Sequence, residues 1–137
     1  MSTADADEQI ALFLASGDFA VVGASNDPEK YGAKIFQALI SKGRKAYPVN
    51  PGAREVQGHT AYPSVDKLPE PAEALSIITP PAVTERVVVE AAAAGCRRVW
   101  MQPGAESDEA IRLAEQGGLS VIAGGPCLLV ALSLEGA

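Results

Sequence analysis

The stretch Phe19–Asn26 constrains the fold more than any other part of the sequence. Its apolar run ends at Gly23, and small polar residues follow before a helical pattern opens. Stiff, apolar residues without polar alternation are typical of a strand that is buried on both faces. Because glycine and alanine carry almost no side chain, phosphate groups can approach backbone N–H groups near the start of the next helix. The stretch therefore predicts a central strand followed by a phosphate-binding turn.

Short apolar runs alternate with longer segments of helical period, which is typical of a parallel sheet with crossover helices. We therefore predict a single Rossmann-like α/β domain over residues 1–137, doubly wound, with a mainly parallel sheet and helices on both faces. Its nucleotide-binding core is expected at 19–127. The expected strands are 19–22, 45–49, 74–79, 98–102 and 119–123, with a short edge strand at 61–62. The expected helices are 7–16, 30–42, 83–94 and 108–116, with one helical turn after Ser64.

Composition disfavours several classes of function. The 137 residues are 47% hydrophobic and 20% charged, which predicts one compact domain. A net charge of −6 argues against a general electrostatic grip on nucleic acid or an anionic membrane, since both need a basic face. No basic and apolar signal segment opens the chain, so we expect a cytoplasmic protein. Cys96 and Cys127 are too few for a disulfide framework, and no Cys/His spacing predicts a metal site.

Glycine and proline turns follow the predicted strands at their carboxyl ends. In an open parallel sheet these ends lie at one edge, and ligands bind there. One such turn carries little weight, because glycine and proline punctuate most loops. Several turns at the same edge predict a ligand groove. They are Gly23-Ala24-Ser25, Asn50-Pro51, Thr79-Pro80-Pro81, Gln102-Pro103-Gly104 and Gly124-Gly125-Pro126.

Two common nucleotide motifs are missing from the sequence. A dinucleotide fingerprint needs Gly-x-Gly-x-x-Gly after the first strand, whereas Gly23 is followed by Ser25 and the next glycine is Gly32. The second predicted strand ends in Asn50-Pro51, without the acidic residue that would bind the ribose hydroxyls of NAD. No Gly-Lys-Ser/Thr sequence occurs, which excludes a P-loop. NAD is therefore disfavoured, and ATP hydrolysis through a P-loop is excluded.

Several motifs occur in a fixed order along the chain, namely Val22-Gly23-Ala24-Ser25, Tyr47-Pro48-Val49-Asn50-Pro51, Thr79-Pro80-Pro81, Val99-Trp100-Met101-Gln102-Pro103-Gly104 and Cys127. This order resembles that of the small stand-alone CoA-binding proteins. They are similar in turn to the CoA-binding domain of the succinyl-CoA synthetase α subunit. The resemblance covers about Phe19 to Cys127. It implies a Rossmann-like fold that binds coenzyme A or an acyl-CoA along the carboxyl edge of the sheet.

The resemblance also implies a role for each turn. Asn50-Pro51 would lie beside the adenosine part of CoA. Thr79-Pro80-Pro81 and Met101-Gln102-Pro103 would flank the pyrophosphate and the pantetheine arm. The phosphate turn itself would consist of Gly23, Ala24, Ser25 and Asn26.

CoA carries a further phosphate on its ribose, which should bind a cation. The candidates are Lys30, Lys34 and Arg54, although the two lysines can equally be solvated surface charges. We also expect that Gly23→Val weakens CoA binding and leaves the fold intact, because a branched side chain would occupy the space of the diphosphate.

No residues form a catalytic constellation. The only histidine, His59, lies in an irregular stretch without a carboxylate partner, so we expect it at the surface. Cys127 follows Gly125-Pro126 at a predicted helix start, where helix dipoles favour a reactive thiolate, but a small buried apolar role explains it more simply. The sequence therefore predicts no enzyme activity in this chain alone.

Three functions stay open. The first, which the motifs favour, is non-catalytic binding of CoA or acyl-CoA as a carrier, sensor or partner subunit, with a homodimer or an enzyme as possible partner. The second is an NAD(H)-responsive sensor or oxidoreductase on the same fold, which the broken fingerprint opposes. The third is the CoA-site subunit of a multi-chain acyl-CoA ligase.

Overall fold

The computed structural model of the chain describes residues 3–125 and 127–135, so Pro126 of the last predicted turn lies outside the described residues. One parallel sheet forms the centre, with the strand order β2-β1-β5-β6-β7. The strands are β1 (Asp18–Val22), β2 (Lys45–Val49), β5 (Ala74–Ile77), β6 (Arg98–Met101) and β7 (Ser120–Ile122). The predicted Rossmann-like α/β fold is confirmed.

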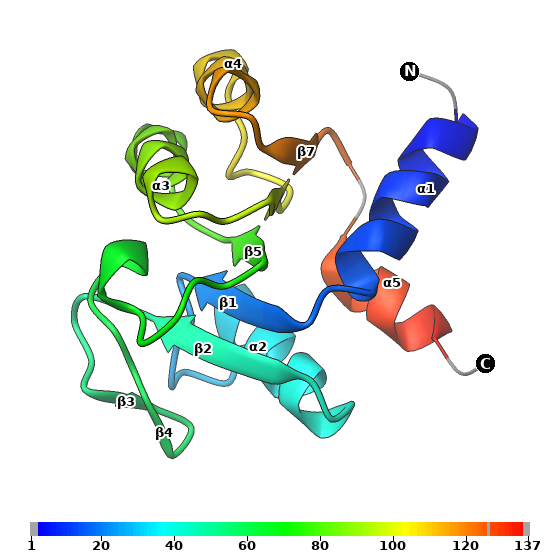
Figure 1. Cartoon of the computed structure of the whole chain (residues 1–137). Helices are drawn as coiled ribbons and strands as arrows, with labels where there is room; N and C mark the ends of the chain where they lie inside the picture. The colour runs from blue at the N-terminus through cyan, green and yellow to red at the C-terminus, as the bar shows by residue number, and fades with distance from the viewer. Residues whose placement is uncertain (1–2, 126, 136–137) are drawn as a thin grey trace.

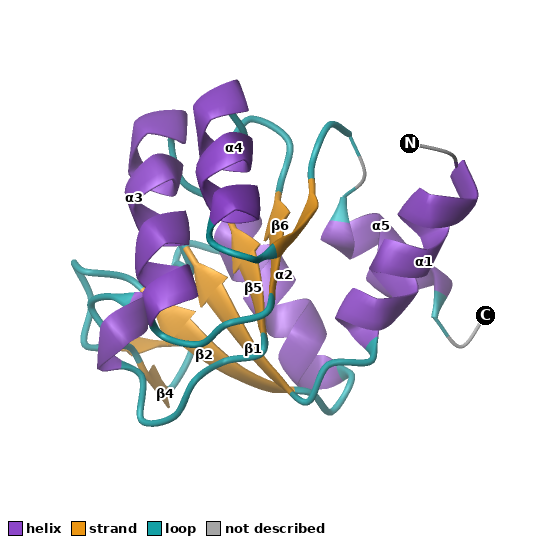
Figure 2. Ribbon diagram, turned by 45° about the horizontal axis from the view of Figure 1, so that its top comes forward, coloured by secondary structure: helices purple, strands orange, loops and turns teal. Residues whose placement is uncertain are grey.

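Helices cover both faces of this sheet (Figures 1 and 2). One face carries α1 (Thr3–Leu14), α2 (Tyr31–Ser41) and α5 (Leu128–Leu134). The other carries α3 (Pro81–Ala93) and α4 (Asp108–Gln116). Side chains alternate along β1: Val21 packs in the core with α2, and Val22 packs in the core with α3. Burial on both faces explains why the strands read as unbroken apolar runs.

Two elements differ from the expectations. The first helix begins at Thr3 and ends at Leu14, whereas residues 7–16 were expected. The sequence did not indicate the earlier start because residues 3–6 carry no apolar stripe. The expected edge strand at 61–62 is reduced to a single bridge between Tyr62 and Val49. The expected helical turn after Ser64 is present as η1 (Val65–Lys67).

A small antiparallel hairpin, not predicted from the sequence, precedes that bridge. It pairs β3 (Glu55–Val56) with β4 (His59–Thr60). Gln57 and Gly58 form its turn, and both have positive φ, as in a type I′ turn. Strands of two residues are too short to show a period of two, so the sequence carries no signal for them.

The carboxyl ends of β1 and β5 mark the switch point of the sheet, where the connections leave in opposite directions along it. Backbone segments are in close contact there. Gly23 has a φ of +98°, and a Cβ at this position would lie 2.1 Å from the carbonyl oxygen of Ile78. A Cβ at Gly32, in the first turn of α2, would lie 2.0 Å from the carbonyl oxygen of Gly23. The two glycines therefore bring β1, β5 and α2 together.

This contact overturns the expectation that Gly23→Val leaves the fold intact. The side chain would collide with the backbone of the neighbouring strand, and its φ would be strained as well. Gly23 is required by the packing of the sheet, so its replacement cannot serve as a test of ligand binding.

Gln102 is a buried polar residue just after β6. Its Nε2 donates to Ser76 Oγ of β5 over 3.2 Å, and its Oε1 accepts from the Leu128 N–H at the start of α5 over 3.0 Å. A buried amide group must have such partners, because an unsatisfied one costs free energy. Gln102 thus ties the last helix to the middle of the sheet.

We predict that Gly32→Ala destabilises the protein by about 1–3 kcal/mol or more, because the new methyl group pushes α2 away from the β1 turn. Gly17→Ala is the matched control, since the nearest atom to its Cβ would be Glu73 Oε1 at 3.8 Å. Its free energy of unfolding should change by no more than about 0.5 kcal/mol. Urea unfolding measures both, and equal stabilities of the two variants would contradict the close contact.

We also predict that Gln102→Leu lowers the free energy of unfolding by about 1–3 kcal/mol, since it leaves the Leu128 N–H without its acceptor. Gln37→Leu on the exposed face of α2 is the control and should be nearly neutral. Hydrogen exchange should in addition show faster exchange of the Leu128 amide in Gln102→Leu than in the control. Unchanged exchange would show that Gln102 does not hold α5.

Candidate functional site

A cavity of about 330 Å³ opens at the carboxyl ends of β1, β2 and β5. Volumes from about 300 Å³ upward are typical of pockets for small molecules. Its remaining walls come from α3 and the segment that leads into η1. The apolar part consists of Val22, Val49, Pro51, Pro63, Val65, Val83 and Val87. Asn50, Ser64, Thr79, Arg86 and Glu90 add polar groups. An apolar cavity with a few polar groups suits a planar ring system that carries polar substituents.

A second hollow of about 280 Å³ lies along the same edge, at the ends of β5 and β6. It is bordered by Pro80, Pro103, Gly104 and Ala105, together with Ile78 and Thr79. Thr79 borders both spaces. The turns after β1, β2, β5 and β6 therefore meet at one edge, as the sequence predicts, and present two neighbouring hollows along it.

Some hydrogen-bonding groups of the predicted phosphate turn are used within the protein, and others are free to bind a ligand. The Gly23 N–H donates to the Val49 carbonyl over 3.0 Å, and Ala24 is fully buried. Ser25 is partly exposed, and its N–H has no acceptor among the described residues. Its Oγ accepts from the Asp27 N–H over 3.0 Å and keeps its own proton. Ser25 therefore offers two donors for an anion.

The start of α2 lies against this turn and adds to its affinity for anions. Tyr31 begins the helix, and its N–H also lacks an acceptor in the described chain. The first turn of α2 contains no acidic residue, and the exposed Lys30 precedes it. Within the first helical turn no carboxylate offsets the positive end of the helix dipole, and Asp27 and Glu29 lie in the loop before it.

Asn26 and Asn50 hold the turns in place. Asn26 Nδ2 donates to the Glu55 carbonyl over 2.7 Å, and its Oδ1 accepts from the Gln57 N–H over 2.8 Å. Both ends of the Asn26 amide are thus used by the hairpin. Asn50 Nδ2 donates to the Ala24 carbonyl over 2.8 Å, and its Oδ1 accepts from the Gly52 N–H over 2.7 Å. Asn50 therefore fixes the β2 turn to the β1 turn, and Pro51 is exposed beside it.

The Thr79-Pro80-Pro81 turn is rigid. Thr79 Oγ1 and the buried Thr84 Oγ1 share a hydrogen bond of 2.7 Å. Pro81 is the first residue of α3, a position that suits proline because its missing N–H has no helical acceptor to lose. Pro80 and Pro81 are exposed, so their rings can contact a ligand.

Met101 and Gln102 lie beneath the edge rather than on it. Both are fully buried: Met101 in the core with α3 and α4, and Gln102 in the bridge to α5. Pro103 is the exposed member of that predicted group.

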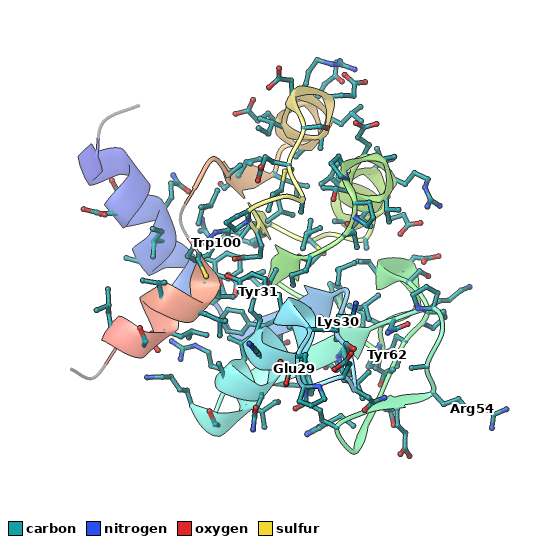
Figure 3. The ribbon with its side chains drawn as sticks, turned by 180° about the vertical axis from the view of Figure 1, so that it is seen from behind. Glu29, Lys30, Tyr31, Arg54, Tyr62 and Trp100 are labelled. Carbon is teal, nitrogen blue, oxygen red and sulfur yellow. The ribbon has the colours of Figure 1, made fainter. Side chains whose placement is uncertain are left out.

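The predicted cations do not line the 330 Å³ cavity, whereas Arg86 of α3 does. Lys34 is exposed on α2, and Arg54 points away from the body of the molecule (Figure 3). Arg86 follows Val83 by three residues and so shares its helix face. That spacing was visible in the sequence, but only the fold shows that this face borders the cavity.

The two cysteines occupy different surroundings. Cys96 is buried, and burial raises the pKa of its thiol to about 11. Cys127 is partly buried at the start of α5 and forms a hydrogen bond with the Tyr31 hydroxyl. Burial and this bond raise the pKa of Tyr31, so the phenol stays protonated at neutral pH. Cys127 thus links α5 to the first turn of α2.

His59 is exposed, as expected, and its ring packs edge-on against Phe36 with 5.2 Å between centroids. The described residues contain no group of three or more His, Cys, Asp or Glu side chains that could hold a metal ion. Of the helices in the described part of the chain, none has both the length and the apolar character of a membrane span.

The proteins that resemble this chain include both larger proteins, of which it matches one part, and proteins of nearly its own length. The chain is 32% identical over 114 residues to subunit alpha of the ADP-forming acetate–CoA ligase II of Pyrococcus furiosus, a match that covers 75% of the chain and 25% of the relative. The chain therefore spans about a quarter of that curated relative's length. A conserved hypothetical protein from Pyrococcus furiosus has nearly the same size, with 41% identity, a TM-score of 0.78 and coverage of 83% of this chain and 97% of that one.

A larger solved structure shares the fold as well. It is the dinucleotide forming acetyl-coenzyme A synthetase 1 of Ca. Korarchaeum cryptofilum in complex with phosphate and ADP, with 32% identity, a TM-score of 0.71 and coverage of 78% of this chain and 25% of that one. The family model of the CoA binding domain matches residues 17–133, which include every strand and turn of the carboxyl edge. The protein therefore belongs to the family of CoA-binding domains.

Proposed function

We propose that this protein binds CoA or an acyl-CoA along the carboxyl edge of its sheet. The observation that carries the proposal is the 330 Å³ cavity at the switch point, which Asn50, Pro51 and Thr79 border in a chain of the CoA-binding family. Ligands of open α/β sheets bind at such a point. CoA is larger than this cavity, so the rest of the ligand would extend along the edge.

The adenosine part would occupy the cavity, against the apolar surface of Pro51 and Val83. The pyrophosphate would lie at Ser25 and the start of α2, where N–H donors and the helix dipole favour anions. The pantetheine arm would follow the second hollow, beside Pro80 and Pro103. Met101 and Gln102 would support this path from below without touching the ligand.

The physiological role would be that of a non-catalytic carrier, sensor or partner subunit. A second candidate is the CoA-site subunit of a multi-chain acyl-CoA ligase. It is favoured by the match to subunit alpha of an acetate–CoA ligase, of which this chain spans only a quarter. Such a subunit would supply the CoA site, and another chain would supply the activating chemistry.

Isothermal titration calorimetry of the purified protein with CoA, acetyl-CoA, NAD⁺ and ATP tests the binding proposal. We expect saturable binding of CoA and no comparable signal for NAD⁺. A preference for NAD⁺, or no binding of CoA, would overturn the proposal. Co-purification with a second polypeptide, and CoA-dependent ligase activity of that complex but of neither chain alone, would favour the ligase subunit over the stand-alone carrier.

We predict that Val83→Phe weakens CoA binding by about tenfold or more, because the larger ring fills the space proposed for adenosine. Val89→Phe is a matched control on the same helix, since Val89 is 51% exposed and lies outside the 330 Å³ cavity. Calorimetry gives the affinities, and thermal unfolding checks that both variants are folded. Equal affinities of the two variants would remove this cavity from the site.

A further inference from the structure

We infer that Arg86 binds a phosphate monoester of the ligand, and that its guanidinium thereby distinguishes CoA from the same nucleotide without its ribose 3′-phosphate. The inference rests on the proposed CoA site and names its phosphate-binding residue. Arg86 is the one basic residue among those that line the 330 Å³ cavity. It comes from α3, the helix that starts at the carboxyl edge.

The charge of Arg86 is not neutralised by the protein. Its guanidinium has no ion-pair or hydrogen-bond partner within residues 3–125 and 127–135. Two other arginines are already engaged. Arg44 contacts Glu135 over 2.8 Å, and Arg112 contacts Glu109 over 2.7 Å. Arg86 therefore presents an available cation to a mainly apolar cavity in a chain of net charge −6.

Guanidinium chemistry suits this role. Its N–H groups can form two parallel hydrogen bonds to phosphate oxygens, which a lysine ammonium cannot match in geometry. A phosphate monoester carries about two negative charges at neutral pH, because its second pKa is about 6. The diphosphate is proposed to bind at Ser25 and the start of α2, so a cation on α3, which covers the other face of the sheet, fits a separate phosphate.

The position of Glu90 indicates where that phosphate would lie. Glu90 borders the same cavity one helical turn beyond Arg86, and the structure shows no ion pair between them. Its carboxylate would repel an anion. The phosphate would therefore bind toward the Arg86 side, nearer the carboxyl edge, and an uncharged base would occupy the region beside Glu90.

The earlier candidates are less well placed. Arg86, Lys34 and Arg54 are all exposed, but of the three only Arg86 borders this cavity. Figure 3 shows Arg54 directed into solvent from the hairpin. Exposed cations that lie outside a cavity interact weakly with a ligand because water and salt screen them. They provide matched controls of the same or similar charge.

Calorimetry with CoA and with 3′-dephospho-CoA tests the inference on the wild type, Arg86→Gln and Arg54→Gln. We expect the wild type and Arg54→Gln to prefer CoA by about ten- to a hundredfold, as for a charge-assisted contact to phosphate. Arg86→Gln should lose this preference because its affinity for CoA falls to that for dephospho-CoA. Its affinity for dephospho-CoA should stay at the wild-type value, which a folding defect would not allow.

The outcomes separate the inference from the proposed function. Binding of neither ligand by the wild type would overturn both. Equal binding of the two ligands by the wild type would overturn the role of Arg86 and leave CoA binding intact. Loss of the preference in Arg54→Gln or Lys34→Gln, but not in Arg86→Gln, would also reject Arg86. The wild-type preference should further decline as the pH falls below about 6, since the monoester then loses one charge.

Discussion

The close approach of backbones at Gly23 and Gly32 is the constraint on which the site depends. Gly23 turns the chain at the end of β1 with a positive φ, and its backbone lies against the Ile78 carbonyl. Gly32 lets the first turn of α2 rest on the Gly23 carbonyl. Without this contact the helix start would stand further from the sheet. Its N–H groups and dipole act only at short range, so they would no longer reach a ligand at the carboxyl edge.

Most polar residues at this edge hold the protein together and are not available to a ligand. Asn26 forms hydrogen bonds with the β3–β4 hairpin, and Asn50 connects the β2 turn to the β1 turn. Gln102 accepts a hydrogen bond from the start of α5. Gln102 is buried, so its amide needs partners, whereas the exposed Asn26 and the half-buried Asn50 satisfy backbone groups of neighbouring turns. The groups left over are few. They include the donors of Ser25, the Tyr31 N–H and the charges of Arg86 and Glu90, and the proposed recognition of CoA depends on them.

The domain presents a preformed carboxyl edge. Its hollows are lined by valine and proline, which hold their shape because proline is conformationally rigid and valine has restricted rotamers. The family also occurs within larger proteins, and the chain covers about a quarter of the acetate–CoA ligase subunit it resembles. An edge of this kind can be combined with other chains or domains without change, because its hollows are lined by the domain's own turns and helix.

The sequence by itself determined the succession of the five parallel strands and of helices α1 to α4, and the edge where the turns meet. These follow from local patterns: apolar runs, helical periods, and glycine or proline at the ends of strands. Only the tertiary structure decided which residues at that edge face the ligand space. Met101 and Gln102 turned out to be buried, Arg54 points away, and Arg86 borders the cavity. The reason is that side-chain direction and hydrogen bonding between distant turns depend on how the elements pack, which no local period in the sequence records.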